Sequence, residues 1–271
     1  MIALEDGFAD VIGKAQRGLR LSDTELAEKA RVSSQKIRKL REGELDELAL
    51  LRVAGVLNLA TRALAELAAG EWRPERVELE GLAQFSTRYH DMLVNAYLIW
   101  NKSSREAVAF DTGADCSALL DLAAQQDLKI KWILLTHAHV DHVADLARLR
   151  EKSGAPICVS SREPVPGAEL IEEGKSFRVG KLNIETRLTW GHSRGGMTYV
   201  VRGLARPVAV VGDSLFAGSM GGGSVSYEDA LQNNLRKILS LPDDTVLCPG
   251  HGPMTTVGEE KIHNPFFAGQ V

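Results

Sequence analysis

Residues 133–142 read Ile-Leu-Leu-Thr-His-Ala-His-Val-Asp-His, an apolar run that leads directly into a cluster of metal-binding side chains. These are three imidazoles and one carboxylate: His137, His139, Asp141 and His142. Without a metal, groups packed this closely would repel one another when protonated and lose solvation when buried. A divalent cation removes both costs, because neutral imidazole and carboxylate are its normal ligands. The stretch predicts a metal site at a strand end, with a surface histidine-rich turn as the alternative.

Three later segments each place another candidate ligand after a strand-like run. The runs 182–188, 208–212 and 245–249 are followed by His192, Asp213 and His251. Taken singly, Asp213 is also explained as a helix N-cap and His192 as an ordinary loop histidine. Because strand ends are rigid enough to hold ligands, we expect all seven residues to form one site. Of the seven histidines in the chain, only His90 and His263 then lack a role.

The composition is that of a soluble globular protein. The 271 residues are 44% hydrophobic and 25% charged, which allows a buried core and excludes a disordered chain. No apolar run approaches the roughly 18–20 residues of a membrane span, and the acidic start is unlike a signal peptide. Three widely spaced cysteines argue against a disulfide framework, so we expect a reducing, cytoplasmic compartment. The net charge of −4 argues against general nucleic-acid coating but leaves room for a local basic patch.

The periodicity of the chain changes near residue 75. Up to about residue 70, apolar residues recur at helical spacing, which predicts a bundle with helices at about 22–30, 34–41, 45–58 and 60–69. The charged, proline-bearing stretch 71–80 reads as a boundary, so the expected domains are 1–74 and 75–271. Seven or eight β-rich runs then alternate with helical patterns at 116–127, 141–152 and 227–240. We expect an α/β sandwich of two sheets with helices outside, preceded by a small all-α bundle.

A family resemblance rests on the candidate ligands and their glycine neighbours. The run from His137 to His142, followed by Gly191-His192, Gly212-Asp213 and Gly250-His251-Gly252, resembles the metallo-β-lactamase superfamily. More narrowly, Gly212–Ser219, Pro249–Pro253 and His263–Phe266, with Asn95 and Asp111-Thr112-Gly113, are similar to its glyoxalase II-like branch. The resemblance implies an αββα sandwich with a dinuclear site.

The same resemblance implies the role of each ligand. His137, His139 and His192 would bind the first metal, Asp141, His142 and His251 the second, and Asp213 would bridge both. The implied cofactor is two divalent ions, with zinc as the first expectation and iron or manganese as alternatives. Such ions lower the pKa of a bridging water and polarise a carbonyl, while Asp141 would orient the hydroxide and take its proton. The expected enzyme is a metal-dependent hydrolase of a thioester or related ester-like bond.

Two segments depart from the pattern of that branch, so the substrate is less defined than the metal site. They are Gly191-His192-Ser193-Arg194-Gly195 and the stretch from Gly221 to Tyr227, Gly-Gly-Gly-Ser-Val-Ser-Tyr. We expect a small-molecule substrate to contact Arg194, Gly221, Gly222 and Tyr227. Residues 221–226 suit a mobile lid, a backbone anion-binding loop or a plain flexible turn.

Residues 21–44 resemble the helix-turn-helix of phage-repressor-like (XRE-type) regulators. The match is carried by Leu26-Ala27, Val32-Ser33, Ile37 and Glu42-Gly43. Between residues 29 and 41 there are six basic side chains and no acid, which suits phosphate contacts. The second helix would present Ser34, Gln35, Lys36 and Lys39 to the major groove of DNA, and binding would need a homodimer. A structural or dimerising bundle is the alternative, and Arg31 occupies a turn position where glycine is usual.

Two other functions stay open at this point. One is a metabolite-responsive, DNA-binding transcriptional regulator that uses the metallohydrolase fold as its sensor. The other is a persulfide dioxygenase-like enzyme with one iron held by two histidines and a carboxylate. The full set of seven candidate ligands favours two metals over one.

Overall fold

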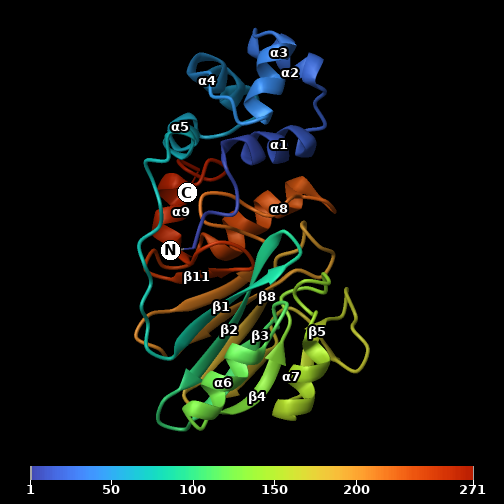
Figure 1. The fold of residues 1–271 in the computed structure, drawn as a ribbon, viewed down its shortest axis with the longest axis vertical. Helices are drawn as coiled ribbons and strands as arrows, with labels where there is room; N and C mark the ends of the chain where they lie inside the picture. Colours follow the sequence, from blue (N-terminus) through green and yellow to red (C-terminus); the bar gives the residue numbers. More distant parts are fainter. Residues whose placement is uncertain (1, 271) are drawn as a thin grey trace.

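The computed structural model describes residues 2–270. Two six-stranded sheets are stacked face to face with helices on their outer faces, and a helical bundle lies at one end (Figure 1). The α/β sandwich with a leading all-α bundle is therefore confirmed. No helix within residues 2–270 is long and apolar enough to cross a membrane.

The first sheet has the strand order β1-β2-β3-β4-β5-β6. Its strands are β1 (Leu82–Tyr89), β2 (Met92–Asn101), β3 (Glu106–Phe110), β4 (Lys129–Leu134), β5 (Ile157–Ser160) and β6 (Glu169–Ile171). The pairs β1–β2 and β2–β3 are antiparallel, and every pair from β3 to β6 is parallel. The carboxyl ends of the parallel strands consequently meet at one edge of the sandwich.

The second sheet has the order β12-β11-β10-β9-β8-β7. Its strands are β7 (Ser176–Val179), β8 (Leu182–Leu188), β9 (Met197–Arg202), β10 (Val208–Gly212), β11 (Val246–Pro249) and β12 (Thr255–Thr256). Only the β10–β11 pair within this sheet is parallel, among the described residues.

Alternate residues of the strands build two layers of core. On the inner faces, Val108 and Phe110 of the first sheet share a buried cluster with Tyr199 and Val201 of the second. The outer face of the first sheet packs against α6 (Ser117–Gln125) and α7 (Leu146–Ser153). The outer face of the second packs against α8 (Tyr227–Asn233), the π-helical turn η1 (Asn234–Ile238) and α9 (Val257–His263). Each sheet is thus buried on both faces.

The N-terminal bundle has five helices within the described residues. They are α1 (Phe8–Gly18), α2 (Asp23–Ala30), α3 (Ser34–Arg41), α4 (Glu47–Val56) and α5 (Thr61–Ala69). Ser22 and Glu25 form a capping box at the start of α2. The turn between α2 and α3 places Arg31 in the left-handed region at φ +54°, where its carbonyl accepts a hydrogen bond from Arg52. The turn forms without glycine, at a conformational cost of about 1–2 kcal/mol.

The bundle and the second sheet share one continuous hydrophobic core. Val11, Ile12 and Leu64 of the bundle belong to the same buried cluster as Leu239 and Phe267. At its edge, the amide of Ala60 donates to the carbonyl of Pro265 at 2.7 Å. The ring of His263 stacks on Trp72 with 4.9 Å between ring centroids. Figure 1 shows this junction, with α1 above α8 and α5 beside α9.

Some elements differ from those predicted. The described residues contain twelve strands rather than seven or eight, because β1, β6, β7 and β12 lack the apolar density of the central strands. The helix predicted over 141–152 begins only at Leu146, since Asp141 and His142 lie in a loop. The helix predicted over 227–240 changes to a π-helical turn at Asn234. The division of the chain into two separate domains, 1–74 and 75–271, remains a prediction.

A buried carboxyl group fastens α9 to the loop after β10. Glu260 is fully buried and accepts hydrogen bonds from the amide of Gly218 at 3.0 Å and from Asn264 at 2.7 Å. Thr255 donates to its other oxygen at 2.8 Å. Burial outweighs these hydrogen bonds and raises the pKa of Glu260 from 4.5 to about 8.

This pKa predicts a pH-dependent stability that Glu260→Gln should remove. A carboxyl whose pKa is higher in the folded chain than in the unfolded chain binds more protons when folded, so its contribution falls as pH rises between the two values. From about pH 5 to pH 8 the wild type should lose on the order of 4 kcal/mol relative to the variant. Urea unfolding of both proteins across this range measures the difference. Parallel stability profiles would contradict the pKa assigned to Glu260.

Candidate metal centre

The candidate ligands lie on loops at one edge of the sandwich. His137 to His142 follow β4 of the first sheet, whereas His192, Asp213 and His251 follow β8, β10 and β11 of the second. Parallel pairing of β10 with β11 brings Asp213 and His251 to the same end of their sheet. The structure therefore brings together all seven residues that the sequence marks as candidate ligands.

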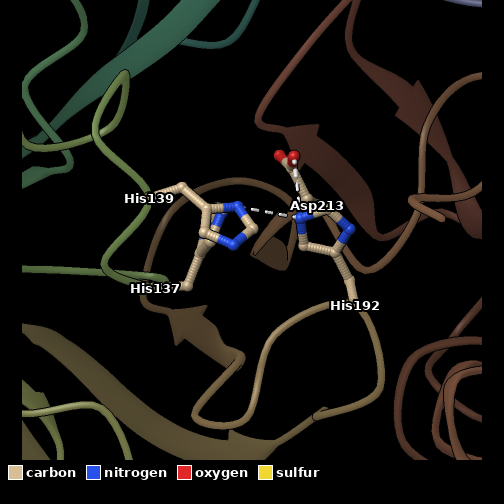
Figure 2. A group of neighbouring side chains, drawn as sticks. All are labelled: His137, His139, His192 and Asp213. Atoms are coloured by element: carbon tan, nitrogen blue, oxygen red, sulfur yellow. Dashed lines mark hydrogen bonds and ion pairs between the residues drawn. The ribbon is translucent and has the colours of Figure 1, made fainter. Parts of the chain in front are cut away.

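The seven side chains form two groups, in each of which one ligand atom per residue lies within 4.8 Å of the others. The first group is His137, His139, His192 and Asp213, which point toward one another in Figure 2. Its nitrogens are closely spaced: His139 Nδ1 lies 3.0 Å from His137 Nε2 and 3.1 Å from His192 Nε2.

The second group is Asp141, His142 and His251, and Asp213 joins it to the first. His251 Nε2 lies 3.3 Å from Asp141 Oδ2 and 3.4 Å from Asp213 Oδ2. The other oxygen of Asp213, Oδ1, lies 3.3 Å from His142 Nε2. Asp213 thus faces both groups, the arrangement that a bridging carboxylate requires.

Each of three imidazoles is oriented by an acceptor behind it. His142 Nδ1 bonds to Asp111 Oδ2 at 2.9 Å, His192 Nδ1 to the carbonyl of Gly222 at 3.0 Å, and His251 Nδ1 to that of Leu93 at 2.6 Å. These bonds leave Nε2 of each ring directed at the cluster. Asp111 is itself fixed by the amide and hydroxyl of Thr136, both at 2.7 Å.

Sequence reasoning gave no role to these carbonyls or to Thr136. A carbonyl leaves no trace in residue identity, so nothing in the sequence could single out Leu93 or Gly222. Asp111 was recognisable from the Asp-Thr-Gly motif as a residue outside the ligand set, and it lies behind His142. The backbone of Asp111 lies in the left-handed region at φ +55°, a strained conformation for a residue with a side chain, and in this conformation its carboxylate faces His142.

The N-terminal segment also reaches this edge of the sandwich, which the sequence does not indicate. A Cβ built on Gly252 would lie 3.2 Å from the amide nitrogen of Glu5, so residues near Glu5 cross the His251 loop. Asp6 is buried and accepts a 2.6 Å hydrogen bond from Ser219, six residues after Asp213.

The donor set fits divalent cations. His142 Nε2 and Asp213 Oδ1 are buried and have no hydrogen-bond partner among residues 2–270. Such atoms are costly to bury unless something else compensates them. A cation held by imidazole and carboxylate ligands satisfies both atoms at once. The residues therefore constitute a His/Asp metal site.

The pKa values in the second group show how the protein balances charge without a metal. Burial opposes protonation of His142, but Asp213 and Asp111 outweigh it and raise its pKa to about 10. Burial opposes protonation of His251 too, but Asp141 and Asp213 raise its pKa to about 11. In the first group, burial and the neighbouring His142 hold the pKa of His137 well below its ordinary range. A metal held by the second group would therefore displace these protons.

The predicted substrate residues lie around this centre in different settings. Arg194 is exposed two residues after His192, and Tyr227 is partly buried at the start of α8. Gly221 is buried, because a Cβ there would lie 1.8 Å from the carbonyl oxygen of Asp213 and 2.9 Å from His192 Nδ1. Its neighbour Gly222 holds His192 through its carbonyl. Residues 221 and 222 therefore support the ligand loops from behind.

Gly250 provides a direct test of the centre. A Cβ at this position would lie 2.1 Å from Asp213 Oδ1 and 2.6 Å from His142 Cε1. We expect Gly250→Ala to displace Asp213 and to lower the metal content by at least one ion per chain, as measured by elemental analysis. The matched control is Gly55→Ala in α4, since a Cβ there meets nothing within 4 Å and the position lies outside the centre. Wild-type metal content in Gly250→Ala would show that Asp213 does not hold metal.

Comparisons with known proteins agree with this geometry. Residues 91–251 match the family model described as "Metallo-beta-lactamase superfamily". The hydroxyacylglutathione hydrolase GloC of Haemophilus influenzae is 29% identical over 197 residues, covering 64% of this chain and 92% of GloC. Two solved structures are each 30% identical and fully covered by this chain. They are BLEG-1, a B3 metallo-beta-lactamase (TM-score 0.59, 69% of this chain), and TTHA1623 in a di-iron-bound form (TM-score 0.56, 68% of this chain).

The matched region contains every candidate ligand, from the end of β4 to the loop after β11. With its two stacked sheets and its clustered histidines and aspartates, this chain belongs to the metallo-β-lactamase superfamily.

Proposed function

We propose that the chain is a dinuclear metal-dependent hydrolase that cleaves a thioester or a related ester-like bond. The observation that carries the proposal is the position of Asp213, whose Oδ2 lies 3.4 Å from both His192 of the first group and His251 of the second, while Oδ1 lies 3.3 Å from His142. A site for one iron, as in a persulfide dioxygenase-like enzyme, needs only one such group. GloC is named for a thioester substrate, hydroxyacylglutathione, and this relation supports the choice of bond.

The residues that would hold the ions follow from the two groups. His137, His139 and His192 would bind the first ion, Asp141, His142 and His251 the second, and Asp213 both. When bound, the two ions would supply Lewis acidity, which lowers the pKa of water toward neutrality and stabilises a developing oxyanion. Zinc suits these ligands, and so does iron, which the di-iron form of TTHA1623 supports.

Asp141 is the side chain that we propose for proton transfer. Burial favours its neutral form, but His251 and His142 outweigh burial and lower its pKa. Bound cations would favour the carboxylate in the same way as these protonated imidazoles, so Asp141 can accept a proton from attacking water. One of its oxygens, Oδ2, is 3.3 Å from His251 Nε2, which orients the group.

The open side of the centre indicates where a substrate enters. His139 is exposed and His192 partly exposed, whereas His137, His142 and His251 are buried. Val140, beside His139, is 65% exposed and offers an apolar surface next to the ligands. Arg194 is exposed in the His192 loop, and we propose that it contacts the substrate.

Metal content and activity should be lost together in His139→Ala. The purified wild type should carry about two metal ions per chain and hydrolyse a thioester within a panel that also includes a lactone, a β-lactam and a phosphodiester. The variant should lose at least one ion, and its kcat/KM should fall on the order of 100-fold or more. His90→Asn, which changes an exposed histidine outside the centre, should retain both properties. Full activity in His139→Ala would refute the ligand assignment, and a preference for the β-lactam would refute the bond assignment.

A second function, DNA binding by a homodimer, is favoured by the helix pair α2 and α3. Gln35, Lys36 and Lys39 are exposed on α3, and Ser34 is partly exposed. Lys36 and Lys39 form surface ion pairs with Asp46 at 2.7 Å and Glu44 at 2.5 Å. Such exposed pairs contribute little, so phosphates can replace the carboxylates. In Figure 1, α2, α3 and α4 lie at the end of the molecule farthest from α6 and α7.

Salt-dependent binding to the DNA upstream of its own gene would support this second function. In a gel-shift assay at low salt, the wild type should retard this DNA, and Lys36→Ala/Lys39→Ala should bind it at least tenfold more weakly. The control variant Lys102→Ala/Lys152→Ala removes equal charge from exposed positions outside the bundle and should bind normally. The absence of a shift with wild-type protein at low salt would leave the bundle with a structural role.

A further inference from the structure

A cavity of about 460 Å³ lies between helix α1 and the glycine-rich loop that precedes α8. One wall is the end of α1, and the opposite wall is the loop from Gly222 to Tyr227. The cavity is therefore built jointly by the N-terminal bundle and the hydrolase fold.

The wall from α1 is strongly basic. Lys14, Arg17 and Arg20 line the cavity, and none of the lining residues is acidic. Lys14 is neutralised by an ion pair with Asp6, and it donates to the carbonyl of Met220 at 2.9 Å. Arg17 and Arg20 are exposed, and within residues 2–270 neither forms an ion pair. Two positive charges beside the cavity are thus unbalanced.

A third guanidinium group, that of Arg41, lies next to Arg17 but outside the lining of the cavity. A Cβ built on Gly13 would lie 3.1 Å from Arg17 Nη1 and 3.6 Å from Arg41 Nε, so the two side chains converge over Gly13. The nearest carboxylate to Arg41, that of Asp23, is 3.9 Å away. Like charges held this close favour an anion between or beside them.

The loop wall is held in place before any ligand binds. The amides of Val225 and Ser226 both donate to the carbonyl of Gly191 at 3.0 Å. Gly18 and Gly223 pack against Tyr227 so closely that a Cβ on either would lie 2.5 Å or less from it. Gly222 differs, since a Cβ there would meet nothing within 4 Å, which leaves its backbone open on the cavity side. These contacts favour a fixed wall over a mobile lid, and they leave recognition of an anion to the basic side chains of the opposite wall.

The same loop connects the cavity to the metal centre. The carbonyl of Gly222 accepts the hydrogen bond of His192 Nδ1 at 3.0 Å, while Gly222 itself lines the cavity. One residue therefore separates the cavity from a candidate metal ligand. The lining of the cavity contains none of the seven candidate ligands, so a substrate arm that starts at the metal centre would have to pass the backbone of Gly222 to reach Arg17 and Arg20.

We propose that this cavity binds the anionic group, a carboxylate or a phosphate, of the substrate's leaving arm. The helical bundle then determines substrate specificity through Arg17 and Arg20. The assignment of the bound anion to a substrate's thiol arm rests on the proposed thioesterase function. Binding of an anion in the cavity does not depend on that function.

Two thioesters with the same acyl group test the substrate assignment. Lactoylglutathione carries two carboxylates on its thiol arm, and the lactoyl thioester of N-acetylcysteamine carries none. For Arg17→Gln/Arg20→Gln we expect KM for lactoylglutathione to rise about tenfold or more with kcat nearly unchanged, because binding away from the reacting carbonyl is lost. The values for the neutral thioester should change less than twofold. Arg38→Gln/Arg76→Gln removes equal charge from exposed positions elsewhere and should leave both substrates unaffected.

Calorimetric titration with ethane-1,2-disulfonate, a dianion whose sulfonates are poor metal ligands, tests the anion site independently of any activity and of the metal centre. The metal-loaded wild type and the Arg38→Gln/Arg76→Gln control should bind this dianion equally, and Arg17→Gln/Arg20→Gln should bind it at least tenfold more weakly. Equal binding by all three proteins would overturn the anion site. Weaker binding combined with an unchanged KM for lactoylglutathione would overturn its assignment to the substrate. If wild-type protein cleaves neither thioester, the proposed function fails while the titration still decides the anion site.

Discussion

The carboxylate of Asp213 is the contact on which the metal centre depends. Three imidazoles from three separate segments, those of His142, His192 and His251, lie 3.3 to 3.4 Å from its two oxygens. A buried charge is tolerable only with partners of opposite charge, so burial of Asp213 draws these segments together. Each imidazole is in turn held by Asp111 or by a backbone carbonyl, and through these bonds the centre is joined to both sheets.

The loop that follows Asp213 is secured from the N-terminal side. Asp6 accepts a hydrogen bond from Ser219, and Lys14 pairs with Asp6 while donating to Met220. Glu260 holds the amide of Gly218 from the opposite direction. Residues 218–222 are thus fixed by groups far apart in sequence, and with them the carbonyl that orients His192. The helical bundle is part of the support of the metal centre.

The features that could be predicted from the sequence are those encoded in the spacing of neighbouring residues. The ligands after β4, β8, β10 and β11 were predictable because each follows a strand-like run within a few residues. The strands β1 and β7 were missed because they are only partly buried and lack a continuous apolar run. The start of α7 was predicted too early, because residues 141–145 have a composition typical of a helix. In the structure these residues form a loop of the metal centre. The support from Leu93 and Gly222 was unpredictable, since any residue type supplies a carbonyl.

The shared hydrophobic core bears on how such a chain can be assembled from parts. A helical bundle joined to an enzyme is usually regarded as a separate domain that hangs on a linker and can be exchanged. Here the linker is anchored, since Trp72 stacks on His263 and the amide of Glu75 donates to Glu259 at 2.8 Å. Separating the parts would expose Ile12 on one side and Phe267 on the other, both fully buried. Neither the bundle nor the hydrolase fold can therefore be exchanged without redesigning the surface of the other.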